Sequence, residues 1–145
     1  MCKRGIYYLT KTLGLKNFKK LFQVVLTDRG VEFQAPKDLE YNNCGKKRTD
    51  IYYCDPQCSW QKGMIEKNHE FIRYVVPKGK SSDYYNQKDM YKLMNNINSI
   101  CRDNLNSYNP FQLSQMLLDC SLHQKLPIRE IHHDDVMLKP ALLEH

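Results

Sequence analysis

The order of apolar and polar residues in the first half of the chain predicts one interrupted helix and two strands. Residues 1–22 carry apolar side chains near helical spacing with lysines between them, which predicts a helix that Gly14 breaks or bends. Residues 22–27 form a nearly continuous apolar run, typical of a strand buried on both faces, and residues 28–30 turn out of it. Residues 49–54 are rich in β-branched and aromatic side chains and predict a second strand.

The second half of the chain predicts three further helices. Before them, residues 34–48 are polar, contain a proline and a glycine, and predict a loop with a short turn of helix. The helices are expected at residues 59–76, 87–102 and 109–120, the last with a proline at its start. The C-terminal tail is predicted to hold a short strand at residues 136–138.

Each of these three helices has an expected apolar face. In the first helix, an apolar stripe runs beside a charged stripe. The apolar stripe is Ile65, His69, Ile72 and Val76, and the charged stripe is Lys62, Glu66, Glu70 and Arg73. The apolar faces of the other two are Met90, Leu93, Met94, Ile97 and Cys101, then Leu113, Met116, Leu117 and Cys120.

Length and composition favour one globular domain with a basic surface. The chain has 145 residues, of which 41% are hydrophobic and 26% charged, as in ordinary soluble domains. Its net charge of +6 favours a polyanionic partner, with nucleic acid first. The domain is expected to span residues 1–142, because residues 143–145 resemble the remnant of an expression tag. No apolar run approaches a membrane span, and the six cysteines are interpreted as reduced thiols of a cytoplasmic protein.

Two carboxylates are the candidates for chemistry. Asp28 follows a buried strand and precedes a glycine turn, where α/β proteins place ligands and metal ions. An aspartate also caps such turns, and the residues favour neither reading. Glu66 belongs to a charged helix face, for which a solvated salt-bridge role is the simpler interpretation. As a pair, the two suit the divalent ions of phosphoryl-transfer chemistry, which need hard oxygen ligands from separate elements.

Other residues of the metal-ligating types have simpler interpretations. Cys44, Cys54, Cys58 and His69 are loosely spaced like zinc ligands, but reduced, partly buried thiols are the favoured interpretation. The run at residues 132–135, His-His-Asp-Asp, is interpreted as a polar turn. Trp60 is expected to pack on a helix start.

Several motifs, in order along the chain, resemble the catalytic core of bacterial insertion-sequence transposases. They occur at residues 27–33 (TDRGVEF), 53–56 (YCDP), 61–68 (QKGMIEKN), 73–79 (RYVVPKG), 95–98 (NNIN), 109–111 (NPF) and 138–140 (LKP). The resemblance is to insertion-sequence family thirty, whose cores are similar to retroviral integrases. It extends from about residue 13 to residue 142.

The resemblance implies an α/β fold of the RNase H-like type with a D-D-E site for Mg²⁺ or Mn²⁺. Asp28 matches the family's second aspartate and Glu66 its glutamate, so both are expected to be catalytic metal ligands. Arg73 matches a basic residue that the family aims at DNA, and Lys62, Lys78 and Lys80 are expected beside it as DNA-binding residues. The expected partner is transposon-end DNA in the cytoplasm of a bacterium.

Three departures from the family pattern shape the expected fold and activity. The first catalytic aspartate, its strand and the following hairpin have no match here, and residues 1–27 contain no Asp or Glu. Arg29 replaces the family's usual Asn, and the spacing from Asp28 to Glu66 is slightly long. We therefore expect an N-terminally truncated core with an incomplete sheet of two or three strands and about four helices. It is expected to be inactive alone.

The missing strands also make a prediction about assembly. The strand at residues 24–26 would lose its neighbours on one side and expose backbone groups and apolar side chains. We expect either a homo-oligomer or coverage of the gap by the helix at residues 1–22. The alternative function is a non-catalytic nucleic-acid-binding or assembly module, and a gene remnant without a selected role is the third reading.

Overall fold

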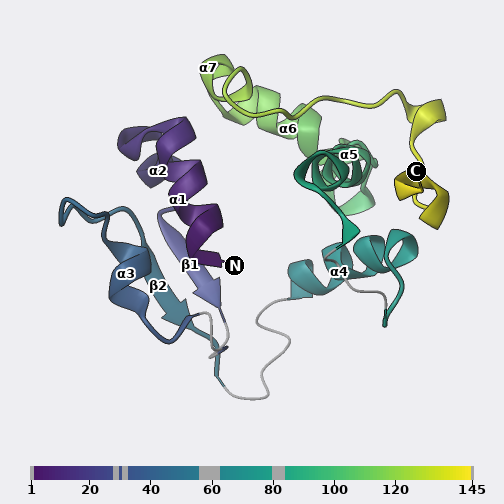
Figure 1. Ribbon diagram of the computed structural model, residues 1–145. Coiled ribbons are helices and arrows are strands. Elements are labelled where there is room, and N and C mark those ends of the chain that lie inside the picture. Colours follow the sequence, from purple (N-terminus) through teal and green to yellow (C-terminus); the bar gives the residue numbers. More distant parts are fainter. Residues whose placement is uncertain (1, 28–29, 31–32, 56–62, 80–83, 145) are drawn as a thin grey trace. The chain divides into compact units, whose positions relative to one another are not determined.

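A computed structural model of the protein describes residues 2–27, 30, 33–55, 63–79 and 84–144 (Figure 1). The chain divides into two compact units, Met1–Gln61 and Lys62–His145. The described elements of the first unit are α1 (Cys2–Leu13), α2 (Leu15–Leu21), β1 (Val24–Thr27), α3 (Pro36–Glu40) and β2 (Asp50–Tyr53). Those of the second are α4 (Gly63–Val75), α5 (Gln87–Asn98), η4 (Asp103–Leu105), α6 (Pro110–Leu117), α7 (Cys120–His123), η5 (His133–Asp135) and η6 (Pro140–Leu143).

Gly14 breaks the first predicted helix into α1 and α2, as the sequence predicts. Its φ is 80°, a left-handed conformation that glycine adopts without steric cost. The Gly14 amide still donates to the Thr10 carbonyl, and the Gly14 carbonyl accepts from the Phe18 amide. The change of direction lets Leu13 and Phe18 both become buried, each 1% exposed.

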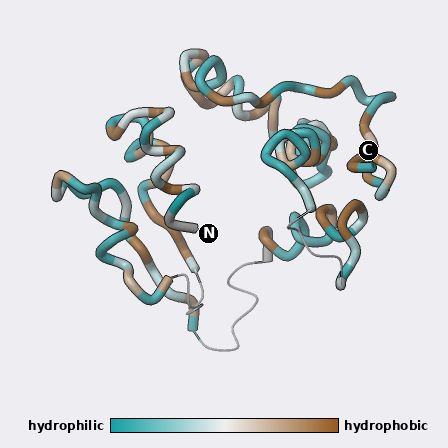
Figure 2. Tube along the Cα trace, in the orientation of Figure 1, coloured by the Kyte–Doolittle hydropathy of each residue, from teal (hydrophilic) through white to brown (hydrophobic). Residues whose placement is uncertain are grey.

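The two predicted strands form a parallel pair. Val24 lies opposite Asp50, and the register continues to Thr27 opposite Tyr53. The expectation that the first strand is buried on both faces is wrong, because Val24 is 57% and Leu26 41% exposed. Among the described residues the sheet has only these two strands, so β1 pairs with a strand on one side only. Figure 2 shows β1 as a hydrophobic stretch, and two of its apolar side chains, Val24 and Leu26, are exposed to solvent.

A buried arginine connects three parts of the first unit. Arg48 is 1% exposed and precedes β2. Its Nε donates to the Leu39 carbonyl and its Nη2 to the Asp38 carbonyl, each at 2.6 Å. These bonds give two carbonyl groups of α3 a hydrogen-bond donor. The guanidinium carbon lies 4.5 Å from the centroid of the Tyr7 ring on α1. The polar sequence of residues 34–48 predicts a loop and gives no sign of this role for Arg48.

The core of the second unit joins α4, α5 and the C-terminal turn η6. Its buried members are Val75, Leu93, Ile97, Leu142 and Leu143. Leu143 is 4% exposed. It therefore packs in the folded unit, one residue beyond the predicted end of the domain at residue 142.

Five residues assigned to the predicted apolar faces of α5 and α6 do not lie on a buried face of their helix. One of them, Cys120, lies beyond α6, in α7, and is exposed. On α5, Met94 is 38% exposed, and the helix ends at Asn98, before Cys101. On α6, Met116 and Leu117 are 63% and 77% exposed, whereas Phe111 is buried. In α6, an eight-residue helix that starts at Pro110, the face with Phe111 packs against the protein, and the face with Met116 and Leu117 is exposed to solvent.

The strand predicted at residues 136–138 does not form. Three buried polar side chains at the C-terminal end of α5 bind the C-terminal segment in place of strand pairing. We call Asn95, Asn96 and the C-cap residue Ser99 the α5 polar cluster. Asn95 Oδ1 accepts from the Arg129 amide, Ser99 Oγ from the Ile131 amide and Asn96 Oδ1 from the Met137 amide. Backbone amides of this segment thus find their hydrogen-bond acceptors on side chains at the end of α5, which the sequence pattern did not reveal.

Replacing Asn96 by alanine is expected to destabilise the second unit by about 1–3 kcal/mol. The substitution leaves the Met137 amide without its acceptor, and a buried unsatisfied donor costs about that much. Asn98→Ala, on the same helix but with a less buried side chain, is the matched control. Hydrogen exchange should accelerate at Met137 in the first variant and stay unchanged in the second; equal exchange in both would contradict the assigned role.

No described helix is both long enough and apolar enough to cross a membrane.

Candidate metal and DNA site on helix α4

Glu66 lies in the first turn of α4 with its side chain exposed to solvent. A carboxylate in this position interacts favourably with the positive end of the helix dipole. Among the described residues, the structure gives the Glu66 carboxylate no ion-pair or hydrogen-bond partner. This agrees with the prediction of an exposed charged face, and it leaves both oxygens available to a ligand.

The next carboxylate on the same face, Glu70, is already engaged. Lys67 Nζ lies 2.8 Å from Glu70 Oε2, and the Tyr74 hydroxyl donates to Glu70 Oε1 at 2.8 Å. The Lys67 hydrogen bond and then the Tyr74 hydrogen bond hold the pKa of Glu70 below its usual value. Glu70 is therefore a charged, internally paired group, whereas Glu66 has the chemistry of an open ligand.

The apolar stripe predicted for this helix is only partly correct. Ile72 and Val76 pack against the core together with Phe71 and the buried Val75. Ile65 is 39% exposed and His69 is also exposed, so the first half of the stripe faces solvent. The reason is that the core of this unit meets only the C-terminal half of α4.

Two of the predicted DNA-binding residues are described, and both are exposed. Arg73 lies seven residues after Glu66, two helical turns along the same face of α4. Lys78 follows the helix in the turn before residue 80. Lys62 and Lys80 lie outside the described residues, as does Trp60.

Asp28 also lies outside the described residues, so its pairing with Glu66 stays a prediction. The strand that leads to it is well defined: the Thr27 carbonyl accepts from the Cys54 amide at 2.8 Å. Since β1 and β2 are parallel, their carboxyl ends meet at one edge, which is where α/β sheets bind ligands. Asp55 follows β2 at that same edge and is exposed, so it joins Asp28 as a candidate that the sequence analysis did not consider.

The alternative metal ligands have simpler explanations in the described residues. Cys44 and Cys54 are free thiols, exposed and buried respectively, and Cys58 lies outside the described part. His132, His133 and Asp134 do bring ligand atoms within 4.8 Å of one another, all on exposed side chains. Asp134 pairs with His132 at 3.5 Å and with His133 at 3.1 Å, in the polar turn η5 that the sequence predicts.

Comparison with known proteins finds several insertion-sequence transposases among the relatives of the chain. The chain is 31% identical over 110 residues to the transposase for insertion sequence element IS1086 of Cupriavidus metallidurans, a match that covers 75% of this chain and 31% of the relative. It is 26% identical over 106 residues to the transposase for IS4351 of Bacteroides fragilis, covering 73% and 31%. The transposase InsI for IS30A of Escherichia coli is 31% identical over 87 residues, covering 59% and 21%.

The matched region thus spans less than a third of the length of these relatives. No protein-family model matches the chain, and no solved structure matches it. At this level the chain is similar to insertion-sequence transposases, including those named for IS30.

Proposed function

We propose that the chain is part of the catalytic core of an insertion-sequence transposase of family thirty and that it contributes two acidic ligands, Asp28 and Glu66, to a divalent metal site. The similarity to named transposases supports the activity class. The observation that carries the site is Glu66, an exposed carboxylate without a partner among the described residues, one turn into a helix. The proposed setting is the cytoplasm of a bacterium.

Mg²⁺ or Mn²⁺ is the ion that this donor set fits. Both ions prefer carboxylate oxygens and keep several water ligands, so a site with few protein ligands suits them. When bound, such ions stabilise the attacking and leaving oxygens of a phosphodiester during in-line displacement. The chain's own part is to present Asp28 from the end of β1 and Glu66 from α4 as ligands, while Arg73, Lys62, Lys78 and Lys80 contact the DNA backbone.

We propose an incomplete RNase H-like sheet as the fold behind this site. The parallel β1–β2 pair, with an acid after its carboxyl edge, supports this proposal. The exposed Val24 and Leu26 support the further proposal that β1 is covered in the active assembly, by another copy of the chain or by other strands of a longer transposase.

A paramagnetic titration with Mn²⁺ tests the metal site. Amide signals next to Glu66 and Asp28 should broaden together at low Mn²⁺ concentration, because one ion would lie near both. Glu66→Gln should weaken Mn²⁺ binding roughly tenfold or more, since it removes a direct ligand. Glu70→Gln is the matched control, because that carboxylate is paired with Lys67 and Tyr74.

Two outcomes would count against the proposal. Broadening near Glu66 without broadening near Asp28 would separate the two acids and remove the shared site. Equal Mn²⁺ affinity of the Glu66→Gln and Glu70→Gln variants would remove Glu66 as a ligand. The isolated chain is expected not to cleave transposon-end DNA with Mg²⁺, and cleavage abolished by Glu66→Gln would overturn that expectation.

The second candidate function is a non-catalytic nucleic-acid-binding or assembly module. The net charge of +6 favours it, with binding through phosphates and with little sequence preference. In this case DNA affinity should fall steeply with salt and be the same for transposon-end and unrelated duplexes. It should also be independent of Mn²⁺ and of Glu66, which distinguishes it from the metal-dependent proposal.

A further inference from the structure

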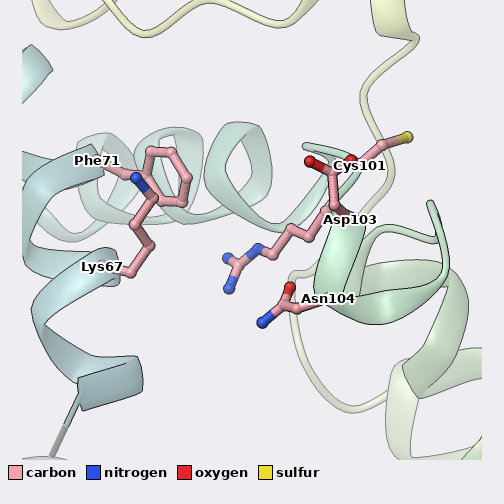
Figure 3. Close-up of a pocket in the computed structure, with 6 residues that line it drawn as sticks. Lys67, Phe71, Cys101, Asp103 and Asn104 are labelled. Carbon is pink, nitrogen blue, oxygen red and sulfur yellow. The ribbon is translucent and has the colours of Figure 1, made fainter.

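A pocket of about 390 Å³ lies between α4 and the segment that follows α5. Six residues line it: Lys67, Phe71, Cys101, Arg102, Asp103 and Asn104. Figure 3 shows Lys67 and Phe71 on one side and Cys101, Asp103 and Asn104 on the other. All six belong to the second unit, and none is among the DNA-binding residues predicted from the sequence.

Arg102 brings a buried hydrogen-bond donor to this pocket that has no acceptor among the described residues. Its Nη2 donates to Asn68 Oδ1 at 3.1 Å, which uses one of its five N–H donors. Its Nε is buried and finds no acceptor in the part of the chain that the structure describes. Partial burial lowers the pKa of Arg102 from its usual value, although a guanidinium stays charged at any physiological pH. A buried donor on a permanent cation is a site that an anion would stabilise.

Lys67 brings a second cation to the same aromatic ring. Its Nζ lies 5.6 Å from the centroid of Phe71, and the Arg102 guanidinium carbon lies 5.4 Å from that centroid. One Lys67 hydrogen bond goes to Glu70, and an ammonium group carries two further donors. Phe71 itself offers an apolar wall suited to a sugar or a base.

No carboxylate among the described residues pairs with Arg102. Asp103 lines the pocket, yet within the described ranges no carboxylate lies at ion-pair distance from Arg102. Glu70 is committed to Lys67 and Tyr74. The pocket therefore combines two cations, an aromatic wall and an unused buried donor.

We propose that this pocket binds a phosphate group of the DNA strand, held by Arg102 and Lys67 with its sugar against Phe71. The identity of the strand rests on the proposed function. Lys67 directly follows Glu66 on α4, so a phosphate in this pocket would fix the DNA close to the metal ligand on the same helix. Planar guanidinium donors suit phosphate oxygens, and a volume of about 390 Å³ accommodates a sugar–phosphate unit.

The first test follows the full chain by NMR during addition of inorganic pyrophosphate. The Nε–H signal of Arg102 should shift strongly, because this donor gains an acceptor, while arginine side-chain signals outside the pocket should shift little. An unchanged Arg102 signal at saturating pyrophosphate, together with a shift elsewhere, would place the anion in another site and overturn the proposal.

The second test measures DNA affinity by fluorescence anisotropy with a labelled duplex. Lys67→Gln and Arg102→Gln should each weaken DNA binding roughly tenfold. Each should also lower the slope of log affinity against log salt concentration by the amount expected for about one phosphate contact. Lys125→Gln removes the same charge from an exposed position of the same unit outside the pocket, and its effect should be small. Equal affinities for Lys67→Gln and Lys125→Gln would contradict the proposal even if Arg102→Gln fails to fold.

These results separate the pocket from the metal site. If the Mn²⁺ titration fails but the pocket variants weaken DNA binding, the phosphate site stands and the catalytic assignment falls. If Glu66→Gln loses Mn²⁺ while the pocket variants bind DNA like Lys125→Gln, the metal site stands and this inference is wrong.

Discussion

Replacing Arg48 by methionine is expected to destabilise the first unit by about 2–4 kcal/mol. Methionine fills similar space but leaves the Leu39 and Asp38 carbonyls without the guanidinium that binds them. Hydrogen bonds to a charged group contribute about 1.5–3 kcal/mol each. Removing a buried charge that has no carboxylate partner among the described residues offsets part of this loss, which gives the net range.

The neighbouring cation provides the control for Arg48. Lys47 is exposed and pairs with Asp50, so Lys47→Met should change the stability of the first unit much less than Arg48→Met does. Hydrogen exchange of the α3 and β2 amides reports the unfolding of the first unit. A loss of protection that is equal in the two variants would show that burial of Arg48 does not stabilise this unit.

Leu93→Ala is expected to destabilise the second unit by about 2–5 kcal/mol. Leu93 is 2% exposed and packs in the core with Ile97 and Val75, so truncation removes buried apolar area and leaves a cavity. The adjacent Met94 is 38% exposed and should tolerate alanine with a change within about 0.5 kcal/mol.

The measurement for Leu93 is hydrogen exchange or urea unfolding followed at α5. The pair also tests the assigned helix rotation, because the sequence pattern placed both residues on the core face. A larger loss for Met94→Ala than for Leu93→Ala would show that α5 presents a different face to the core.

The sequence predicted the secondary structure best where local chemistry decides it. The break at Gly14, the start of α6 at Pro110 and the strand that ends at Tyr53 were all predicted correctly, because backbone preference acts there within a few residues. The short helix expected in the loop is α3. Boundaries were less accurate: the helix predicted to end at residue 102 ends at Asn98.

Long-range packing explains the features that the sequence pattern missed. Arg48 looks like a loop cation until α3 and α1 close around it. Met116 and Leu117 look like a core face, but the second unit has no layer to cover them in its described part. The α5 polar cluster looks like a polar run, and only the tertiary structure brings residues 129–137 to it.

The candidate site was predictable to different degrees along the chain. The exposure of Glu66 and Arg73 followed from the charged helical stripe, and the structure confirms it for both. Arg102 was not a candidate, since a single arginine after a helix gives no pattern. Its role depends on Asn68 and Phe71, which lie more than thirty positions away along the chain.

The arrangement of the second unit has a consequence for synthesis on the ribosome. Both the amides bound by the α5 polar cluster and the core residues Leu142 and Leu143 come late in the chain. During translation, α4 and α5 would leave the ribosome before these residues. Their apolar core surface would then lack Leu142 and Leu143, and the Asn95 and Asn96 side-chain oxygens would lack their amide donors. The second unit therefore completes its fold only after the residues up to 143 have left the exit tunnel, whereas the first unit can fold earlier.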